Sequence, residues 1–295
     1  MTAPGPIAAL LDGGSRLHLQ HGPIDLIIGA DAPVPDGRRC AFAAAAARFK
    51  GLLAELVAEL PLLRAEMTAD LPPPQSPVAR RMRDAVLPHA GVFITGMAAV
   101  AGAVADEILA AMTTALPLTR AYVNNGGDIA VHLGEGAGFT TAMVGLDGRD
   151  LGRIALTAGD GIGGIATSGA GGRSFSLGIA DSVTVLARSA AAADAAATLI
   201  ANAVDLPGHP GIRRQPARDL QPDSDLGSRL VVTGVPPLPA AGIARALDAG
   251  AARAAELRAA GHIAAAALFL QGGQRLVGGP FDDRFRMKEV IHAEG

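Results

Sequence analysis

The sequence is poor in several residue types, and each shortage excludes a class of protein. It has no tryptophan, a single tyrosine, 3% aromatic residues and a formal net charge of −3. Proteins that bind nucleic acid combine a basic surface with aromatic rings that stack on bases. We therefore exclude DNA and RNA as partners and expect a small-molecule ligand.

Lysine and cysteine are almost absent. Lys50 and Lys288 are the only lysines, so a P-loop is excluded and a Schiff-base mechanism has few candidates. Cys40 is the only cysteine, which excludes an intramolecular disulfide, a thiolate zinc site and an iron–sulfur cluster. A lone cysteine fits a reducing compartment, and we expect a cytoplasmic protein.

Uninterrupted apolar runs of membrane-spanning length are also missing. The first residues carry no positive charge before a short apolar stretch that stops at Asp12, which does not fit a signal peptide. The most apolar later stretch, 94–116, is interrupted by Asp106 and Glu107, and adjacent carboxylates are costly in a bilayer. We expect a buried helix there and no membrane partner.

Apolar residues are plentiful, since 49% of the 295 residues are hydrophobic, which is enough to bury a large core. We expect one domain over 1–295, built as a single core or as two pseudo-repeated halves. Alternation and turn residues predict strands at 16–20, 24–29, 121–123, 129–133, 139–146, 153–156, 183–187 and 229–235, with a final hairpin across 272–273. Periodicity predicts long helices at 38–60, after Gly96, at 189–204 and at 240–260.

Hairpins separated by long helices favour an antiparallel sheet with helices on one face, so the predicted class is α+β. The polar, proline-containing stretch 205–229 is predicted to be a surface excursion or a flap over a pocket. The alanine-rich helices would tolerate close packing in a homo-oligomer, and they would equally well fill the core of a monomer.

Three segments occur in a characteristic order: VNNGGDIAV at 123–131, GIGGIATSG at 161–169 and DSVTVLARSAAAADAAAT at 181–198. In this order they resemble the ApbE flavin-transferase superfamily, which has an asparagine-glycine-glycine-acid turn, a small-residue Ser-Gly loop and a Val-Thr-Val strand leading into an Ala-Asp-Ala helix. RLHLQHGPIDLIIGA near the start and DLPGHPG at 205–211 are similar to the cytoplasmic branch of that superfamily, whose function is unknown.

The resemblance implies a duplicated T-fold-like antiparallel sheet with long helices packed on it. Superfamily members of known activity split FAD and attach FMN to a threonine of a partner protein, using magnesium. The resemblance therefore implies Mg²⁺ and FAD as cofactors and a nucleotide as the ligand.

Asp194 and Thr198 are the predicted metal ligands. They are four residues apart on a predicted helix and so share one face, where they offer a carboxylate and a hydroxyl oxygen to a hard cation such as Mg²⁺. The alternative is a solvated charge beside a packing residue. The motifs on either side favour the metal, and Asp194 is also, with Arg173, one of two predicted catalytic residues.

Asn124, Gly126, Gly127 and Asp128 form a predicted turn between two strands. Two glycines there are fully explained by a hairpin turn that needs positive φ. The alternative is that a turn without side chains lets a flavin or its pyrophosphate approach the backbone, with Asn124 and Asp128 at the edge of the ligand. Both interpretations stay open on the sequence.

Thr167, Ser168 and Gly169 end the glycine-rich segment 161–169, which is predicted to be a loop that presents backbone N–H groups to a phosphate. A merely flexible loop is the alternative. Ser168 is not a hydrolase nucleophile, because Ala166 and Ala170 replace the flanking glycines of that motif.

Two departures from the superfamily pattern concern catalysis. Ala101 stands where active members carry a lysine, and 173–181 lacks their His-x-x-Asp-Pro element. Arg173 is the predicted substitute for the lost positive charge, because a guanidinium can hold a phosphate through two hydrogen bonds. The leading hypothesis is an FAD-processing, Mg²⁺-dependent, transferase-like enzyme. The alternatives are a non-catalytic flavin-binding or regulatory protein, and an enzyme acting on another small substrate.

Overall fold

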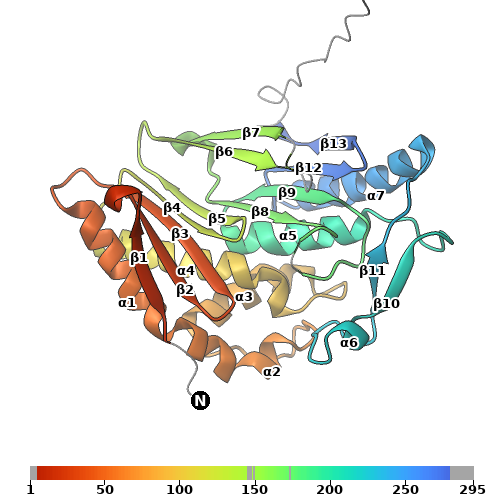
Figure 1. Cartoon of the computed structure of the whole chain (residues 1–295), viewed down its shortest axis with the longest axis horizontal. Coiled ribbons are helices and arrows are strands. Elements are labelled where there is room, and N and C mark those ends of the chain that lie inside the picture. The colour runs from red at the N-terminus through yellow and green to blue at the C-terminus, as the bar shows by residue number, and fades with distance from the viewer. Residues whose placement is uncertain (1–4, 145–147, 149, 173, 280–295) are drawn as a thin grey trace, which may run out of the picture.

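The protein is an α+β structure built on a large antiparallel sheet, as the sequence predicts (Figure 1). The computed structural model describes residues 5–144, 148, 150–172 and 174–279. Within this part of the chain, the nine-stranded sheet has the order β1-β2-β3-β4-β5-β8-β9-β12-β13. Its strands are β1 (Ile7–Leu11), β2 (Arg16–His21), β3 (Ile24–Asp31), β4 (Arg120–Asn125), β5 (Asp128–Leu133), β8 (Gly164–Ser168), β9 (Ser182–Ala187), β12 (Ala265–Leu270) and β13 (Gly273–Val277).

The two halves of the sheet repeat one order of elements. In the first half, β2 and β3 precede the long helices α1 (Gly37–Ala58) and α4 (Val100–Ala115), and β4 and β5 follow them. In the second half, β8 and β9 precede α5 (Ala190–Ala203) and α7 (Ala240–Ala259), and β12 and β13 follow. The inner strands pair in each half, β3 with β4 and β9 with β12, and β5 pairs with β8 to join the halves.

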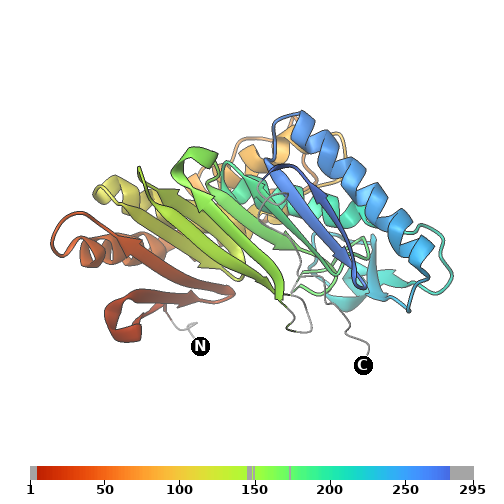
Figure 2. The same cartoon turned by 90° about the horizontal axis from the view of Figure 1, so that it is seen from above.

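The long helices cover one face of the sheet (Figure 2). Because side chains alternate along a strand, Leu26 and Ile28 of β3 point into a core shared with α1 and α4. Val183 and Val185 of β9 point into a second core beneath α5 and α7. On the opposite face, the hairpin of β6 (Gly138–Val144) and β7 (Asp150–Thr157) packs Ile154 against a third core.

Shorter elements complete the described chain. They are α2 (Leu60–Leu63), α3 (Pro77–Val86), β10 (Arg213–Pro216), α6 (Ala217–Leu220), β11 (Leu230–Gly234) and 3-10 turns at Asp12–Gly14, Leu87–His89, Gly96–Ala99 and Ala158–Asp160. The residues of β10 and α6 lie inside the predicted excursion 205–229, where β10 pairs with β11 outside the large sheet. The tip of the β6–β7 turn, at 145–147 and 149, lies outside the described residues.

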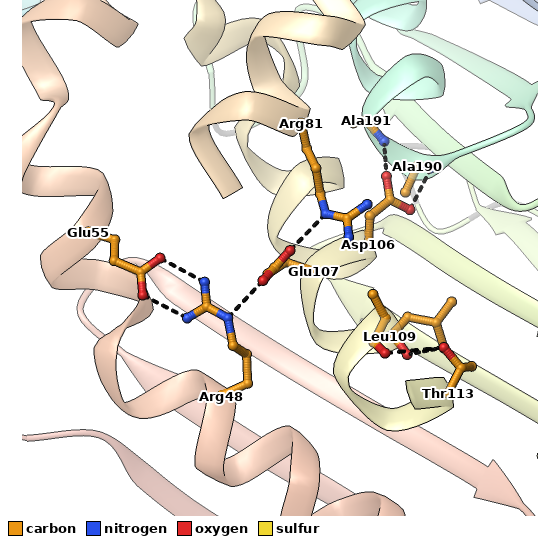
Figure 3. A network of polar contacts seen from close by, with 10 residues as sticks. Arg48, Glu55, Arg81, Asp106, Glu107, Leu109, Thr113, Ala190 and Ala191 are labelled. Carbon is orange, nitrogen blue, oxygen red and sulfur yellow. Dashed lines mark hydrogen bonds and ion pairs between the residues drawn. The ribbon is translucent and has the colours of Figure 1, made fainter. Parts of the chain in front are cut away.

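Gly96–Ala115 is a core helix, as the sequence predicts. By length and composition alone it could cross a membrane, but 56% of that stretch is buried inside the protein. Its two mid-helix carboxylates also have protein partners (Figure 3). Glu107 accepts hydrogen bonds from Arg48 and Arg81, each at 2.8 Å, and so links α4 to α1 and α3.

The elements that were not predicted from the sequence include β1, α3 and β8. In α3, Pro77 occupies the first turn, where proline's missing N–H costs nothing. The prediction that 161–169 is a continuous loop is wrong, because Gly164–Ser168 is strand β8. Its register with β9 runs from Gly164 opposite Ala187 to Ser168 opposite Val183.

Candidate functional site

A cavity of about 500 Å³ lies where the β4–β5 turn, the end of β8, the start of α4, one face of α5 and the segment 221–226 meet. Most of the predicted site residues line it. They are Gly126, Asp128, Thr167, Ser168, Gly169, Asp194 and Thr198. The residues come from both halves of the sheet, so the site is assembled across the β5–β8 join.

Asp194 lies at the centre of the contacts between α4 and α5. Its Oδ2 accepts a hydrogen bond from the Gly102 N–H at 3.1 Å, in the first turn of α4, and the Ala101 amide also stabilises its charge. Burial nevertheless raises the pKa of Asp194 well above its ordinary value, and the carboxylate of Asp128 raises it further. A cation bound at this carboxylate would offset both effects.

Asp106 makes the reverse contact, from α4 to α5. Its two carboxylate oxygens accept hydrogen bonds from the Ala190 N–H at 3.0 Å and the Ala191 N–H at 2.9 Å. The first-turn amides of α5 favour a negative charge at this position. Asp106 of α4 bonds to the first-turn amides of α5, and Asp194 of α5 bonds to a first-turn amide of α4. These two contacts fix the helices against each other. They also set the position of Asp194.

The β4–β5 turn has the geometry that its two glycines require. Gly126 and Gly127 have φ of 66° and 112°, and the Gly127 N–H donates to Asn124 Oδ1 at 2.8 Å. Asn124 thus closes the turn, and among the described residues neither it nor Gly127 lines the cavity. Asp128 does line it, and its Oδ1 accepts a hydrogen bond from the Thr167 N–H at 3.2 Å.

The segment 161–169, which was predicted to present backbone N–H groups to a phosphate, has fewer free N–H groups than the sequence implies. Hydrogen bonds within the sheet occupy much of β8, and the Thr167 hydroxyl lies 2.9 Å from that of Thr184. Gly169, with φ of 154°, begins the turn that follows, and its chain neighbours Gly171 and Gly172 also line the cavity. Arg173, the predicted cationic catalytic residue, lies outside the described residues.

The segment 221–226 supplies lining residues that sequence reasoning missed. Asp223 accepts a hydrogen bond from Arg64 Nη2 at 2.8 Å, and Asp225 accepts one from the Thr95 hydroxyl at 2.5 Å. These bonds hold the polar excursion against the first half of the protein. The only sequence signal was the prediction that 205–229 forms a flap over a pocket.

Two aromatic rings, Phe93 and Phe175, line the same cavity. The guanidinium of Arg229 lies over the Phe93 ring, 3.1 Å from its centroid, and fixes that ring through a cation–π contact. In a chain with 3% aromatic residues, two rings in one cavity are a concentration of flat apolar surface.

The cavity is acidic. Asp128, Asp194, Asp223 and Asp225 line it, while Arg64 is its one basic lining residue within the described part of the chain. No group of three or more His, Cys, Asp or Glu in that part is arranged to hold a metal ion. The donor set fits a hard cation such as Mg²⁺, which binds through one or two carboxylates and keeps several waters.

Fold and site together define an α+β protein with an acidic, glycine-lined cavity near the β5–β8 pairing of its large sheet. Residues 8–276 match the family described as "AbpE bacteria". The chain belongs to that family, and the resemblance to the ApbE superfamily that the three motifs indicated is confirmed.

Two relatives are UPF0280 proteins of archaea. The chain is 38% identical to that of Methanothrix thermoacetophila over 160 residues, which cover 52% of this chain and 63% of the relative. It is 44% identical to that of Methanopyrus kandleri over 111 residues, covering 36% of this chain and 42% of the relative. The chain thus spans less than two thirds of the length of either relative.

The solved structures that the chain matches include flavin transferases. The apo flavinyl transferase ApbE of Pseudomonas stutzeri has 13% identity and a TM-score of 0.46, with 95% of this chain and 96% of that chain covered. The flavin transferase ApbE of Vibrio cholerae has 13% identity and a TM-score of 0.39, with 90% and 98% covered. The ApbE protein of Thermotoga maritima has 13% identity and a TM-score of 0.42, with 63% and 86% covered.

Proposed function

We propose that this protein binds FAD or a related nucleotide together with Mg²⁺ in the cavity and acts on its phosphate linkage, as a flavin-transferase-like enzyme of the cytoplasm. The observation that carries the proposal is the charge of the cavity. Four aspartates and one arginine line it among the described residues, so a diphosphate would be repelled unless a cation entered with it.

The residues of the chain have distinct proposed roles. Asp194 and Thr198, one helical turn apart on α5, provide oxygen ligands for the cation, and the Asp128 carboxylate beside them adds negative charge that favours it. Bound Mg²⁺ would supply neutralisation of the charge that develops on the phosphate oxygens. The α4 amides that hold Asp194 keep its carboxylate oriented towards the cavity.

The remaining lining residues suit the rest of a nucleotide. Gly126 and Gly169 carry no side chain, so a pyrophosphate can approach the backbone there. Phe93 and Phe175 offer ring faces for a flat base or an isoalloxazine ring. We also propose that the fold is a single domain made of two T-fold-like units, which the repeated order of strands and helices supports.

AMP release tests the proposal. Metal-free protein is incubated with FAD, with and without Mg²⁺, and AMP is quantified. We expect release that requires Mg²⁺ and that falls by at least about tenfold in Asp194→Asn, because the variant lacks a charged metal ligand. Asp248→Asn, which removes an exposed helical carboxylate paired with Arg275, is the matched control and should release AMP at the wild-type rate. Wild-type protein that neither binds FAD nor releases AMP would refute the proposal.

A second candidate is a flavin-binding protein without catalytic activity. Ala101 lines the cavity and places a methyl group where the active superfamily members carry a lysine. Arg64, the basic lining residue, is already paired with Asp223. Tight binding of FAD without any release of AMP would select this candidate.

A further inference from the structure

A second hollow lies at the other end of strand β4 from the cavity. Its volume is about 210 Å³. It is formed by β2, β3, β4 and the start of α1, and the residues that line it are Ser15, Arg16, Gly29, Ala30, Asp31, Arg38, Arg120 and Tyr122. None of these residues lines the larger cavity. Three of the eight are arginines, which is unusual in a chain whose net charge is −3.

Asp31 holds two of these arginines in place. Arg38 reaches from the first turn of α1, donating from Nη2 to Asp31 Oδ1 at 2.8 Å and from Nε to the Ala30 carbonyl at 2.8 Å. Arg120, at the start of β4, donates to Asp31 Oδ2 from Nε at 3.0 Å and from Nη2 at 2.6 Å. The two guanidiniums hold the pKa of Asp31 below its usual value, so this carboxylate stays charged and keeps both arginines oriented.

Arg16 completes the set from strand β2. Its Nε bonds to Asp12, and Gly29, its partner across the β2–β3 pair, has Tyr122 as its partner on β4. A Cβ at Gly29 would clash with the Tyr122 ring, so the glycine allows the ring to lie against the β3 backbone. Tyr122 therefore lines the hollow together with the three arginines, and its phenol group interacts with the guanidinium of Arg16.

The charges of the hollow do not cancel. Its three arginines form ion pairs with only two carboxylates, Asp31 and Asp12, so one net positive charge remains. Arg16 bonds to Asp12 through Nε and also interacts with the Tyr122 side chain. Arg38 donates from Nε and Nη2, and Arg120 also donates from Nη1 to the Gly138 carbonyl at 3.4 Å. Within the described part of the chain, no hydrogen bond uses Arg38 Nη1. Further guanidinium N–H donors therefore remain. The side chains are 44–48% exposed, so a solute can reach them.

We propose that this hollow is a binding site for a small oxyanion, the phosphate or carboxylate group of a metabolite. Guanidinium groups recognise such groups through paired, charge-assisted hydrogen bonds, and those bonds are about twice as strong as neutral ones. The site is separate from the acidic cavity, and the proposal does not depend on flavin chemistry.

The chain contains its own reporter for this site. Tyr122 is the only tyrosine and there is no tryptophan, so the intrinsic fluorescence of the protein comes from the wall of the hollow. Inorganic phosphate and succinate are titrated separately at constant ionic strength, and isothermal calorimetry repeats each titration. We expect a saturable change in tyrosine emission with a matching heat, and the tighter of the two anions identifies the ligand class.

Two variants and one control test the assignment. Arg38→Gln removes a guanidinium that holds the site and should weaken binding by about tenfold or more. Arg16→Gln should weaken it similarly, and it changes the contacts of an exposed side chain with Asp12 and Tyr122, so the fold is kept. Arg39→Gln removes the same charge from the neighbouring residue, whose side chain is 79% exposed and does not line the hollow, and should leave affinity within about twofold. Absence of saturable binding of both anions in both measurements, or equal weakening by all three substitutions, would overturn the proposal.

Discussion

The Asp194 carboxylate is held by α4 amides but is destabilised by its surroundings. Burial, then the carboxylates of Asp128 and Asp106, raise the pKa of Asp194 well above its ordinary value of about 4. The folded protein therefore binds this proton more tightly than the unfolded chain. The stability that follows from this is full below about pH 4 and is lost as pH rises through the raised pKa.

Asp194→Asn removes this titration. In metal-free buffer, we expect the free energy of unfolding of the variant to increase relative to wild type as the pH rises from about 4. The reason is that only the wild type must ionise a buried carboxyl group as the pH rises. Urea unfolding at a series of pH values measures the difference. Parallel curves for the two proteins would show that Asp194 ionises as easily in the fold as in the unfolded chain.

The pKa of His89 is shifted so that the protein loses stability at low pH rather than at high pH. Burial, then the positive charges of His262 and Arg253, lower the pKa of His89 to about 4. The neutral ring contributes stability that is present above the ordinary histidine pKa of about 6.5 and is lost as pH falls towards 4, up to about 3 kcal/mol.

His89→Gln should remove most of this acid-dependent loss. Unfolding free energies at pH 7 and at about pH 4.5 are compared for wild type and His89→Gln. Wild type should lose the larger amount of stability on acidification. An equal loss in His89→Gln would mean that His89 is protonated in the fold.

At the scale of residues, the motifs predicted only those parts of the site that lie within them. Asp128, Ser168, Asp194 and Thr198 belong to the three motif segments, and all four line one cavity. Asp223, which comes from a segment without a recognisable pattern, was not predicted. Its place at the cavity depends on a bond to Arg64, 159 residues earlier in the chain, and such a contact leaves no local signal.

At the scale of elements, a buried ionic network joins α1, α3 and α4 (Figure 3). Arg48 donates to Glu55 through both Nη atoms, at 2.9 and 2.7 Å, and to Glu107 through Nε at 2.8 Å. The side chains of Arg48 and Glu107 are 19% and 10% exposed, so removing one partner leaves a charge in a poorly solvated position.

Glu107→Gln should lower the free energy of unfolding by about 2–4 kcal/mol, because Arg48 and Arg81 both lose a charged partner. Arg48→Gln should cost a similar amount, and the double variant less than the sum of the two. Urea unfolding measures all three, with Glu256→Gln, which removes an exposed pair, expected within about 0.5 kcal/mol of wild type. Additive losses in the double variant would show that the two side chains are not coupled.

Helices with long apolar periodicity were predictable, whereas β8 was not. The glycines in and around β8 look like those of a flexible loop. A Cβ at Gly164, however, would clash with the backbone of Ser189 and Ala190 at the start of α5. A Cβ at Gly102 would likewise meet the Ala190 carbonyl. These glycines permit close approach of elements. That requirement becomes visible only once the elements are packed together.

At the scale of the whole molecule, the sequence predicted an α+β fold, built as a single core or as two pseudo-repeated halves, but not which strands pair at the centre of the sheet. The β5–β8 pairing places the Gly126 turn of the first half beside Ser168 of the second, and α4 and α5 meet directly above that join. The β5–β8 pairing joins segments that are far apart in the sequence, so it depends on how the two halves of the sheet fit together. The cavity at the join is therefore a property of the assembled chain.

The central claim is that this one acidic cavity accepts a nucleotide only when a divalent cation accompanies it. Equilibrium dialysis of metal-free protein against FAD, with Mg²⁺ and with EDTA, tests the claim most directly, because bound flavin is read from its visible absorbance. We predict stoichiometric binding that is at least about tenfold tighter with Mg²⁺. FAD that binds equally well in EDTA, or that does not bind in either buffer, would contradict the claim.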